Sequence, residues 1–119
     1  MLYKKARVKE VNMQIEEHNN FIKLFDLYGN LLSKKQFEVM DKHLNFDLGE
    51  SELAELLGES RQSVHDAVTK AKKQLLEFEE KCKFAKTLSN LKENLLEVKT
   101  LINENNKASK MLDDIIKEI

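Results

Sequence analysis

The sequence lacks proline and tryptophan and has only three glycines, Gly29, Gly49 and Gly58, in 119 residues. Proline and glycine interrupt helices, so a chain with so few of them favours long helices. A single cysteine, Cys82, excludes an internal disulfide. No apolar run is long enough for a membrane-spanning helix or a secretory signal, which predicts a cytoplasmic protein without membrane insertion.

The composition predicts a helical protein with one modest core. Hydrophobic residues make up 41% of the chain and charged residues 34%, and the net charge is -1. That balance is typical of a domain continued by long, exposed amphipathic helices. Because the net charge is close to zero, no field from the whole molecule attracts nucleic acid or an anionic membrane.

The first half of the chain has the periodicity of amphipathic helices. Apolar residues recur at helical spacing over residues 21–32, and a weaker pattern predicts that this helix begins near Val8. Ser33 and Gln36 form a predicted capping box at the start of the next helix. Phe37, Met40 and Leu44 are expected to share the buried face of that helix.

Residues 51–64 predict two helices joined by a sharp turn. Ser51 is expected to cap the first helix, and Ser60 the second. Ala54 is small where the helices must approach, Gly58 can adopt a left-handed conformation, and Val64 points back between the helices. This spacing, with apolar neighbours, is typical of a helix-turn-helix motif.

The second helix of the motif supplies a predicted nucleic-acid-binding face. Its expected contact residues are Arg61, Gln62, Ser63, His65, Thr69 and Lys70. Arginine and glutamine at the start of such a helix can contact base edges, and lysine can bind phosphate. The alternative is that Arg61 and Gln62 hold nearby carboxylates and that the lysines form a solvated helix surface.

The two helices of the motif carry net charges of opposite sign. Residues 60–73 have a net charge of +3, which favours nucleic acid. Residues 47–59 have a net charge of -5 and no lysine or arginine, and in standard docking this helix crosses the phosphate backbone. The sequence therefore indicates the fold more strongly than it indicates DNA binding.

Beyond the motif, the sequence predicts two long helices with coiled-coil-like seams. The first seam runs from Val64 to Ala85 and includes Cys82 as a small buried residue. Residues 86–90 are expected to break the register, with Asn90 capping a new helix. The second seam runs to the C-terminus and has two polar positions, Asn105 and Ser109. Such helices predict an antiparallel hairpin, a homodimer, or both.

Several segments in the same order resemble the YlxM family of small bacterial helix-turn-helix proteins. They are LFDLYGNLL, the LSKKQ corner, ELAELLGESRQSVHDAV and LLEFEEK, within residues 21–86. The resemblance implies a fold similar to region 4 of bacterial sigma factors and a role in the signal recognition particle pathway. His65 stands where the family is expected to have tyrosine. The predicted organisation is an N-terminal helical extension (1–20), the helix-turn-helix domain (21–86) and a C-terminal amphipathic helix (87–119).

No arrangement of residues predicts catalysis. The three histidines lie far apart in sequence without ligand-like neighbours, and there is no glycine-rich phosphate loop or catalytic triad. We therefore expect a protein that is not an enzyme and needs no cofactor or metal.

Three functions remain open. The first is a regulator of the signal recognition particle pathway that binds DNA or the particle's RNA. The second is a protein-interaction module that docks on signal recognition particle proteins. The third is a sequence-specific transcription regulator, whose dimer would bind two half-sites about one helical turn apart.

Overall fold

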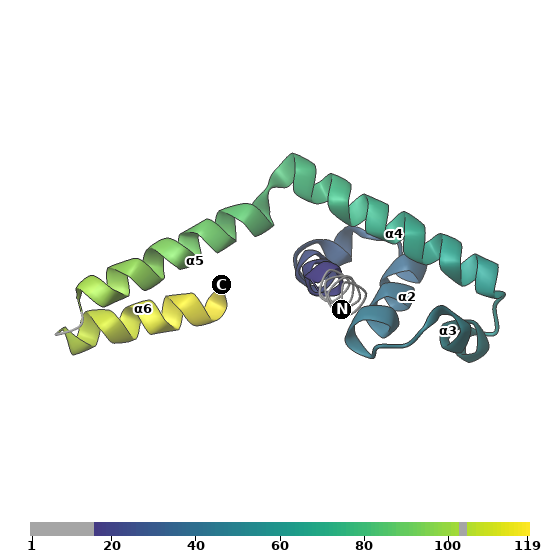
Figure 1. The fold of residues 1–119 in the computed structure, drawn as a ribbon, viewed down its shortest axis with the longest axis horizontal. Coiled ribbons are helices and arrows are strands. Elements are labelled where there is room, and N and C mark those ends of the chain that lie inside the picture. Colours follow the sequence, from purple (N-terminus) through teal and green to yellow (C-terminus); the bar gives the residue numbers. More distant parts are fainter. Residues whose placement is uncertain (1–15, 103–104) are drawn as a thin grey trace, which may run out of the picture. The chain divides into compact units, whose positions relative to one another are not determined.

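The structure, a computed structural model, describes residues 16–102 and 105–119, and every regular element among them is helical (Figure 1). It divides into an N-terminal unit, Met1–Cys82, and a C-terminal unit, Lys83–Ile119. The predicted all-α class is confirmed. The predicted helix start near Val8 lies outside the described residues. No helix of the described residues is long and apolar enough to cross a membrane.

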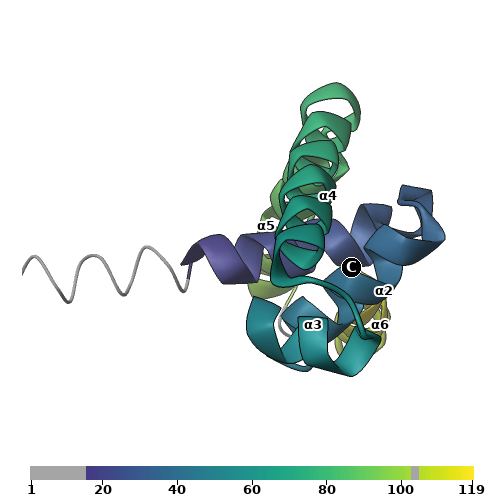
Figure 2. The ribbon, with the colours of Figure 1, turned by 90° about the vertical axis from the view of Figure 1, so that its right-hand side faces the viewer.

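From residue 16 onward, the N-terminal unit contains four α-helices and a short 3-10 turn. Residues 16–28 are helical and lead into η1 (Gly29–Leu31), which is followed by α2 (Lys34–Asn45), α3 (Glu50–Leu57) and α4 (Arg61–Cys82). Helix α2 contacts both α3 and α4, and α3 contacts α4. Figures 1 and 2 show α3 and α4 following each other around a tight turn, with α2 beside them.

Each helix of the N-terminal unit contributes apolar side chains to one core. The buried residues are Phe21, Leu24, Phe25, Tyr28, Leu32, Val39, Met40, Leu44, Leu53, Ala54, Val64, Val68, Ala71 and Leu75. Burying a large aliphatic or aromatic side chain stabilises the fold by about 1.5–3 kcal/mol. The predicted buried face of α2 is confirmed at Met40 and Leu44. Phe37 lies at the edge, 37% exposed, with its ring 5.0 Å from that of Phe25.

The helix of residues 16–28 is fixed against α4 by polar and aromatic contacts as well as by the core. The hydroxyl of Tyr28 donates a hydrogen bond of 2.8 Å to Glu79, and the Tyr28 ring lies 6.0 Å from that of Phe78. The Lys72 ammonium lies 5.0 Å from the centre of the Phe21 ring, within the range of a cation–π interaction. The middle of α4 is therefore a structural part of the domain.

The helix starts confirm two predicted caps and correct a third. The backbone N–H of Gln36 donates to the Ser33 hydroxyl at 3.2 Å, and the Gln36 side chain accepts from the Ser33 backbone, so the capping box is present. Ser60 accepts from the backbone N–H of Ser63 at 3.0 Å. The prediction for Ser51 is wrong. Helix α3 begins at Glu50, two residues earlier than predicted, and Gly49 is its N-cap.

The junction after the helix-turn-helix domain also differs from the prediction. Helix α4 ends at Cys82, Lys83 has a φ of 55°, and α5 (Phe84–Leu101) begins directly after it. The predicted break at residues 86–90 therefore lies inside α5, and Asn90 caps nothing. Cys82 is exposed rather than buried in a seam. The core of the N-terminal unit ends at Leu75, so seam positions beyond it need not be covered.

The C-terminal unit consists of α5 and α6 (Asn106–Glu118), which contact each other and lie side by side in Figure 1. The Lys99 ammonium forms an ion pair with Asp113. Asn105 was expected at a polar position within a seam, and this prediction is wrong. Its side chain accepts the backbone N–H of Ala108 at 3.1 Å and caps α6. Asparagine competes for backbone donors, so it starts a helix readily.

Candidate nucleic-acid interface

The turn between α3 and α4 has the geometry of a helix-turn-helix motif. Gly58 adopts a left-handed conformation (φ 66°, ψ 31°), and its N–H bonds to the carbonyls of Ala54 and Glu55. The N–H of Glu59 donates to Ala54 at 3.0 Å. Ala54 is nearly buried at the helix crossing, and Val64 is completely buried. The residues predicted to form the turn therefore do so.

A polar cluster closes the turn at the start of α4. The Ser63 hydroxyl donates to Glu59 at 3.3 Å and accepts from Lys35 of α2 at 3.4 Å. Lys35 also forms an ion pair of 3.1 Å with Glu59. Ser63 was predicted to contact nucleic acid, but it is half-buried and bonded within the turn. Its arrangement favours positioning the start of α4.

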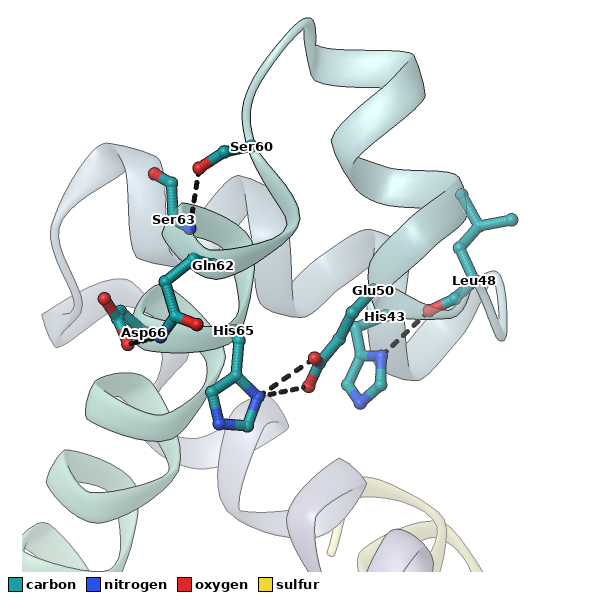
Figure 3. Close-up of polar contacts among 8 residues, drawn as sticks. All are labelled: His43, Leu48, Glu50, Ser60, Gln62, Ser63, His65 and Asp66. Atoms are coloured by element: carbon teal, nitrogen blue, oxygen red, sulfur yellow. Dashed lines mark hydrogen bonds and ion pairs between the residues drawn. The ribbon is translucent and has the colours of Figure 1, made fainter.

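His65 and Glu50 link α4 to the beginning of α3. The Nδ1 atom of His65 lies 2.9 and 3.0 Å from the two carboxylate oxygens of Glu50 (Figure 3). The His65 side chain is 54% exposed, and that of Glu50 is 27% exposed. This contact gives a partner to one of the five carboxylates of residues 47–59. It also draws His65 towards α3 at the edge of the predicted face.

Arg61, Gln62 and His65 surround an open hollow together with Glu50. The hollow has a volume of about 450 Å³. Gln62 donates a hydrogen bond of 3.0 Å to Asp66 one helical turn away (Figure 3). Arg61 is exposed and makes no hydrogen bond or ion pair with another described residue. The guanidinium of Arg61 is therefore available for a ligand at the mouth of the hollow.

Thr69 and Lys70 lie two turns further along α4. Both are exposed, and neither is hydrogen bonded through its side chain to another described residue. Like Arg61 and Gln62, they are exposed side chains of α4. Five of the six predicted residues are thus exposed on α4, while Ser63 belongs to the turn.

Two residues close to this surface were not predicted as members of the site. Lys35 reaches the turn from α2, and Glu50 reaches His65 from α3. Both contacts join residues far apart in the chain, so no local pattern of residues indicates them. The five acidic residues of 47–59 indicate that carboxylates lie near the turn, but their number does not show which of them are paired. Glu50 and Glu59 are paired, whereas Glu52 and Glu55 are exposed.

Comparison with known proteins gives consistent relatives along nearly the whole chain. A family model described as "UPF0122: Putative helix-turn-helix protein, YlxM / p13 like" matches residues 15–119. A UPF0122 protein of Clostridium perfringens strain 13 is 37% identical over 100 residues, covering 81% of this chain and 89% of the relative. A UPF0122 protein of Fusobacterium nucleatum is 29% identical over 104 residues, covering 87% of this chain and 100% of the relative. No solved structure matches. The family match extends beyond residues 21–86, to α5 and α6.

Proposed function

Because the chain belongs to the UPF0122 family of YlxM/p13-like helix-turn-helix proteins, we propose that it binds nucleic acid through the exposed face of α4. We further propose that this binding serves regulation of the signal recognition particle pathway. The observation that carries the proposal is Arg61, whose exposed guanidinium stands at the start of α4 beside an open hollow. The proposed role is binding rather than catalysis.

The residues along α4 divide into two kinds of contact. Arg61 and Gln62 stand at the start of the helix, which is the part that reaches base edges in helix-turn-helix complexes. Gln62 would exchange its hydrogen bond to Asp66 for one to the ligand. Lys70 and Thr69 lie further along and suit phosphate oxygens. His65 borders the contact, held by Glu50.

The local charge favours a small footprint on nucleic acid. The acidic side chains of α3 adjoin the face, and exposed Glu52 and Glu55 would repel a phosphate backbone placed across that helix. The ion pair between Glu59 and Lys35 reduces this repulsion near the start of α4. We therefore propose that the ligand approaches along α4 and avoids α3. A folded RNA with locally exposed bases meets this requirement more readily than a long uniform duplex.

The decisive test is fluorescence anisotropy with labelled signal recognition particle RNA and a length-matched mixed-sequence DNA duplex over a salt series. We expect salt-sensitive binding to one of them, with a shallow slope because few phosphates are neutralised. A preference for particular duplex sequences would favour the transcription regulator instead. Binding to neither nucleic acid at moderate salt would refute the proposal.

Charge reversal locates the contact. Arg61→Glu and Lys70→Glu are expected to weaken binding by roughly tenfold or more each, since each replaces an attraction by a repulsion. Lys23→Glu, on the exposed surface of the helix of residues 16–28, makes the same charge change elsewhere and is the matched control. Equal losses in all three variants would mean that only total charge matters and that the face is misassigned.

A second function is favoured by the surface of α3. Leu56 is 60% exposed on α3, which also carries the exposed carboxylates of Glu52 and Glu55. An exposed apolar side chain on an acidic helix suits a basic protein surface with an apolar patch. The protein would then dock on signal recognition particle proteins. Retention of purified particle proteins after nuclease treatment, and its loss in Leu56→Lys, would support this function. No retention would exclude it.

A further inference from the structure

Helix α5 carries a complete heptad pattern of which α6 covers only half. One line of the pattern consists of Leu88, Leu95 and Ile102, which are all half-buried. The other line includes Leu91 and Val98, which are 43% and 42% exposed. In a coiled coil, the residues at both positions of the heptad are buried against a partner helix. In the described part of the C-terminal unit, α6 covers mainly the first line, so Leu91 and Val98 remain open to another helix.

Helix α6 repeats this arrangement. Its half-buried line is Leu112, Ile116 and Ile119. Beside that line, Met111 and Ile115 are 58% and 46% exposed. Neither α5 nor α6 has a single buried residue. A pair of helices without a buried side chain has little apolar burial to offset the entropy of ordering the chain.

The two exposed lines lie on the same side of the hairpin. With about 100° between successive residues, Leu91 and Val98 are displaced by roughly 50° from the half-buried line of α5. Met111 and Ile115 are displaced from the half-buried line of α6 by roughly 90° in the same rotational sense. The helices run in opposite directions (Figure 1), and equal rotation on antiparallel helices turns both lines to one side. We name Leu91, Val98, Met111 and Ile115 the open face.

The charges around the open face select no partner of one sign. Next to Leu91 and Val98, the surface of α5 carries Thr87, Asn94 and Leu101, all uncharged. The edge along α6 carries one cation, Lys107, and two anions, Asp114 and Glu118. Residues 83–119 have a net charge of +1. A nucleic acid, an anionic membrane or a strongly charged protein would each find little attraction here.

The pattern is instead complementary to itself. The midpoints of the exposed pair on α5 and of the exposed pair on α6 both lie about nine residues from the connection between the helices. A single twofold axis through that level would place Met111 opposite Ile115 of a second copy. The same axis would place Lys107 near Glu118 of that copy. Interfaces with this property are the ones that homodimers form.

We propose that the open face is the contact through which two copies of this chain associate, forming a four-helix bundle from two α5–α6 hairpins. Helix α5 is roughly 27 Å long, and two adjacent helices are roughly 20 Å wide, so the face measures roughly 500 Å² before the relief of its side chains is counted. Stable interfaces bury about 600–1,000 Å² per partner. Burial of the face gives each hairpin the core that it otherwise lacks.

Sedimentation equilibrium of the full-length protein over a concentration series, without nucleic acid, tests the proposal. We expect a monomer–dimer equilibrium. Leu91→Lys and Met111→Lys, one on each helix, are expected to raise the dimer Kd about 100-fold or more, because each places an unpaired ammonium in an apolar contact. Leu96→Lys is the matched control, since Leu96 is 45% exposed on α5 but lies on the opposite side of the half-buried line.

Each outcome of this experiment either supports or overturns the proposed dimer contact. A dimer that is lost in Leu91→Lys and Met111→Lys but kept in Leu96→Lys supports the proposal. A wild-type monomer at all concentrations overturns it, as does a dimer that survives both open-face substitutions or is equally weakened by the control. The substitutions lie outside α4 and the core of the N-terminal unit. Far-ultraviolet circular dichroism of each variant verifies that this unit stays folded. None of these outcomes bears on Arg61 and the nucleic-acid proposal, because no nucleic acid is present.

Discussion

The two units of the chain are built from helices of similar length and polarity but differ in what those helices bury. Helices of the N-terminal unit meet around a core that includes six residues with no exposed surface, namely Val39, Met40, Leu53, Val64, Ala71 and Leu75. In the C-terminal unit, neither α5 nor α6 has a buried residue. Amphipathic periodicity is present in both units. The difference teaches that periodicity specifies a helix and its apolar side, whereas stability depends on how many neighbours cover that side.

The largest expected effect on stability comes from removing a fully buried side chain of the N-terminal unit. Leu75→Ala removes a side chain with no exposed surface, and we expect it to lower the free energy of unfolding of the N-terminal unit by about 2–5 kcal/mol. Leu95→Ala makes the same chemical change at a half-buried position of α5 and is expected to cost about 1 kcal/mol. Urea denaturation followed by circular dichroism measures both. Equal costs would contradict the difference in burial between the units.

A smaller effect is expected at the turn that only the N-terminal unit has. Gly58→Ala forces a Cβ into the left-handed region, which should cost about 1–2 kcal/mol. No atom lies within 4 Å of that Cβ, so the cost comes from the backbone alone. Gly58→Asn should therefore recover part of it, because asparagine tolerates this conformation. Thermal unfolding ranks the variants as Gly, Asn and Ala, and an Asn variant no better than Ala would indicate a steric cause.

The smallest expected effects compare a helix cap from each unit. Ser33→Ala removes the capping box of α2, and Asn105→Ala removes the side-chain cap of α6, each at a cost of about 1 kcal/mol or less. The first loss should lower the unfolding midpoint of the N-terminal unit. The second should leave that midpoint unchanged and increase amide hydrogen exchange in α6. A change of the N-terminal midpoint in Asn105→Ala would show that the two units unfold together.

The sequence predicts those features of the structure that local interactions determine. The turn residues Ala54, Gly58 and Val64 and the capping box at Ser33 were predicted correctly, because local sterics and local hydrogen bonds determine them. Arg61, Thr69 and Lys70 were placed correctly on an exposed face by helical periodicity alone.

The failures share a physical cause. Lys83 leaves the helical conformation without a glycine or proline to indicate it, and the exposure of Cys82 follows from where the core ends rather than from its seam position. Asn105 fits a seam position and a cap equally well by sequence. The pairing of His65 with Glu50 and of Lys35 with Glu59 depends on helix packing, which no local pattern encodes.

The hydrogen bond from Tyr28 to Glu79 joins residues 51 positions apart. On a ribosome, which synthesises the chain from its N-terminus, the helix of residues 16–28 leaves the exit tunnel long before its partner in α4 does. The N-terminal unit therefore cannot complete its packing until about residue 80 has emerged from the tunnel.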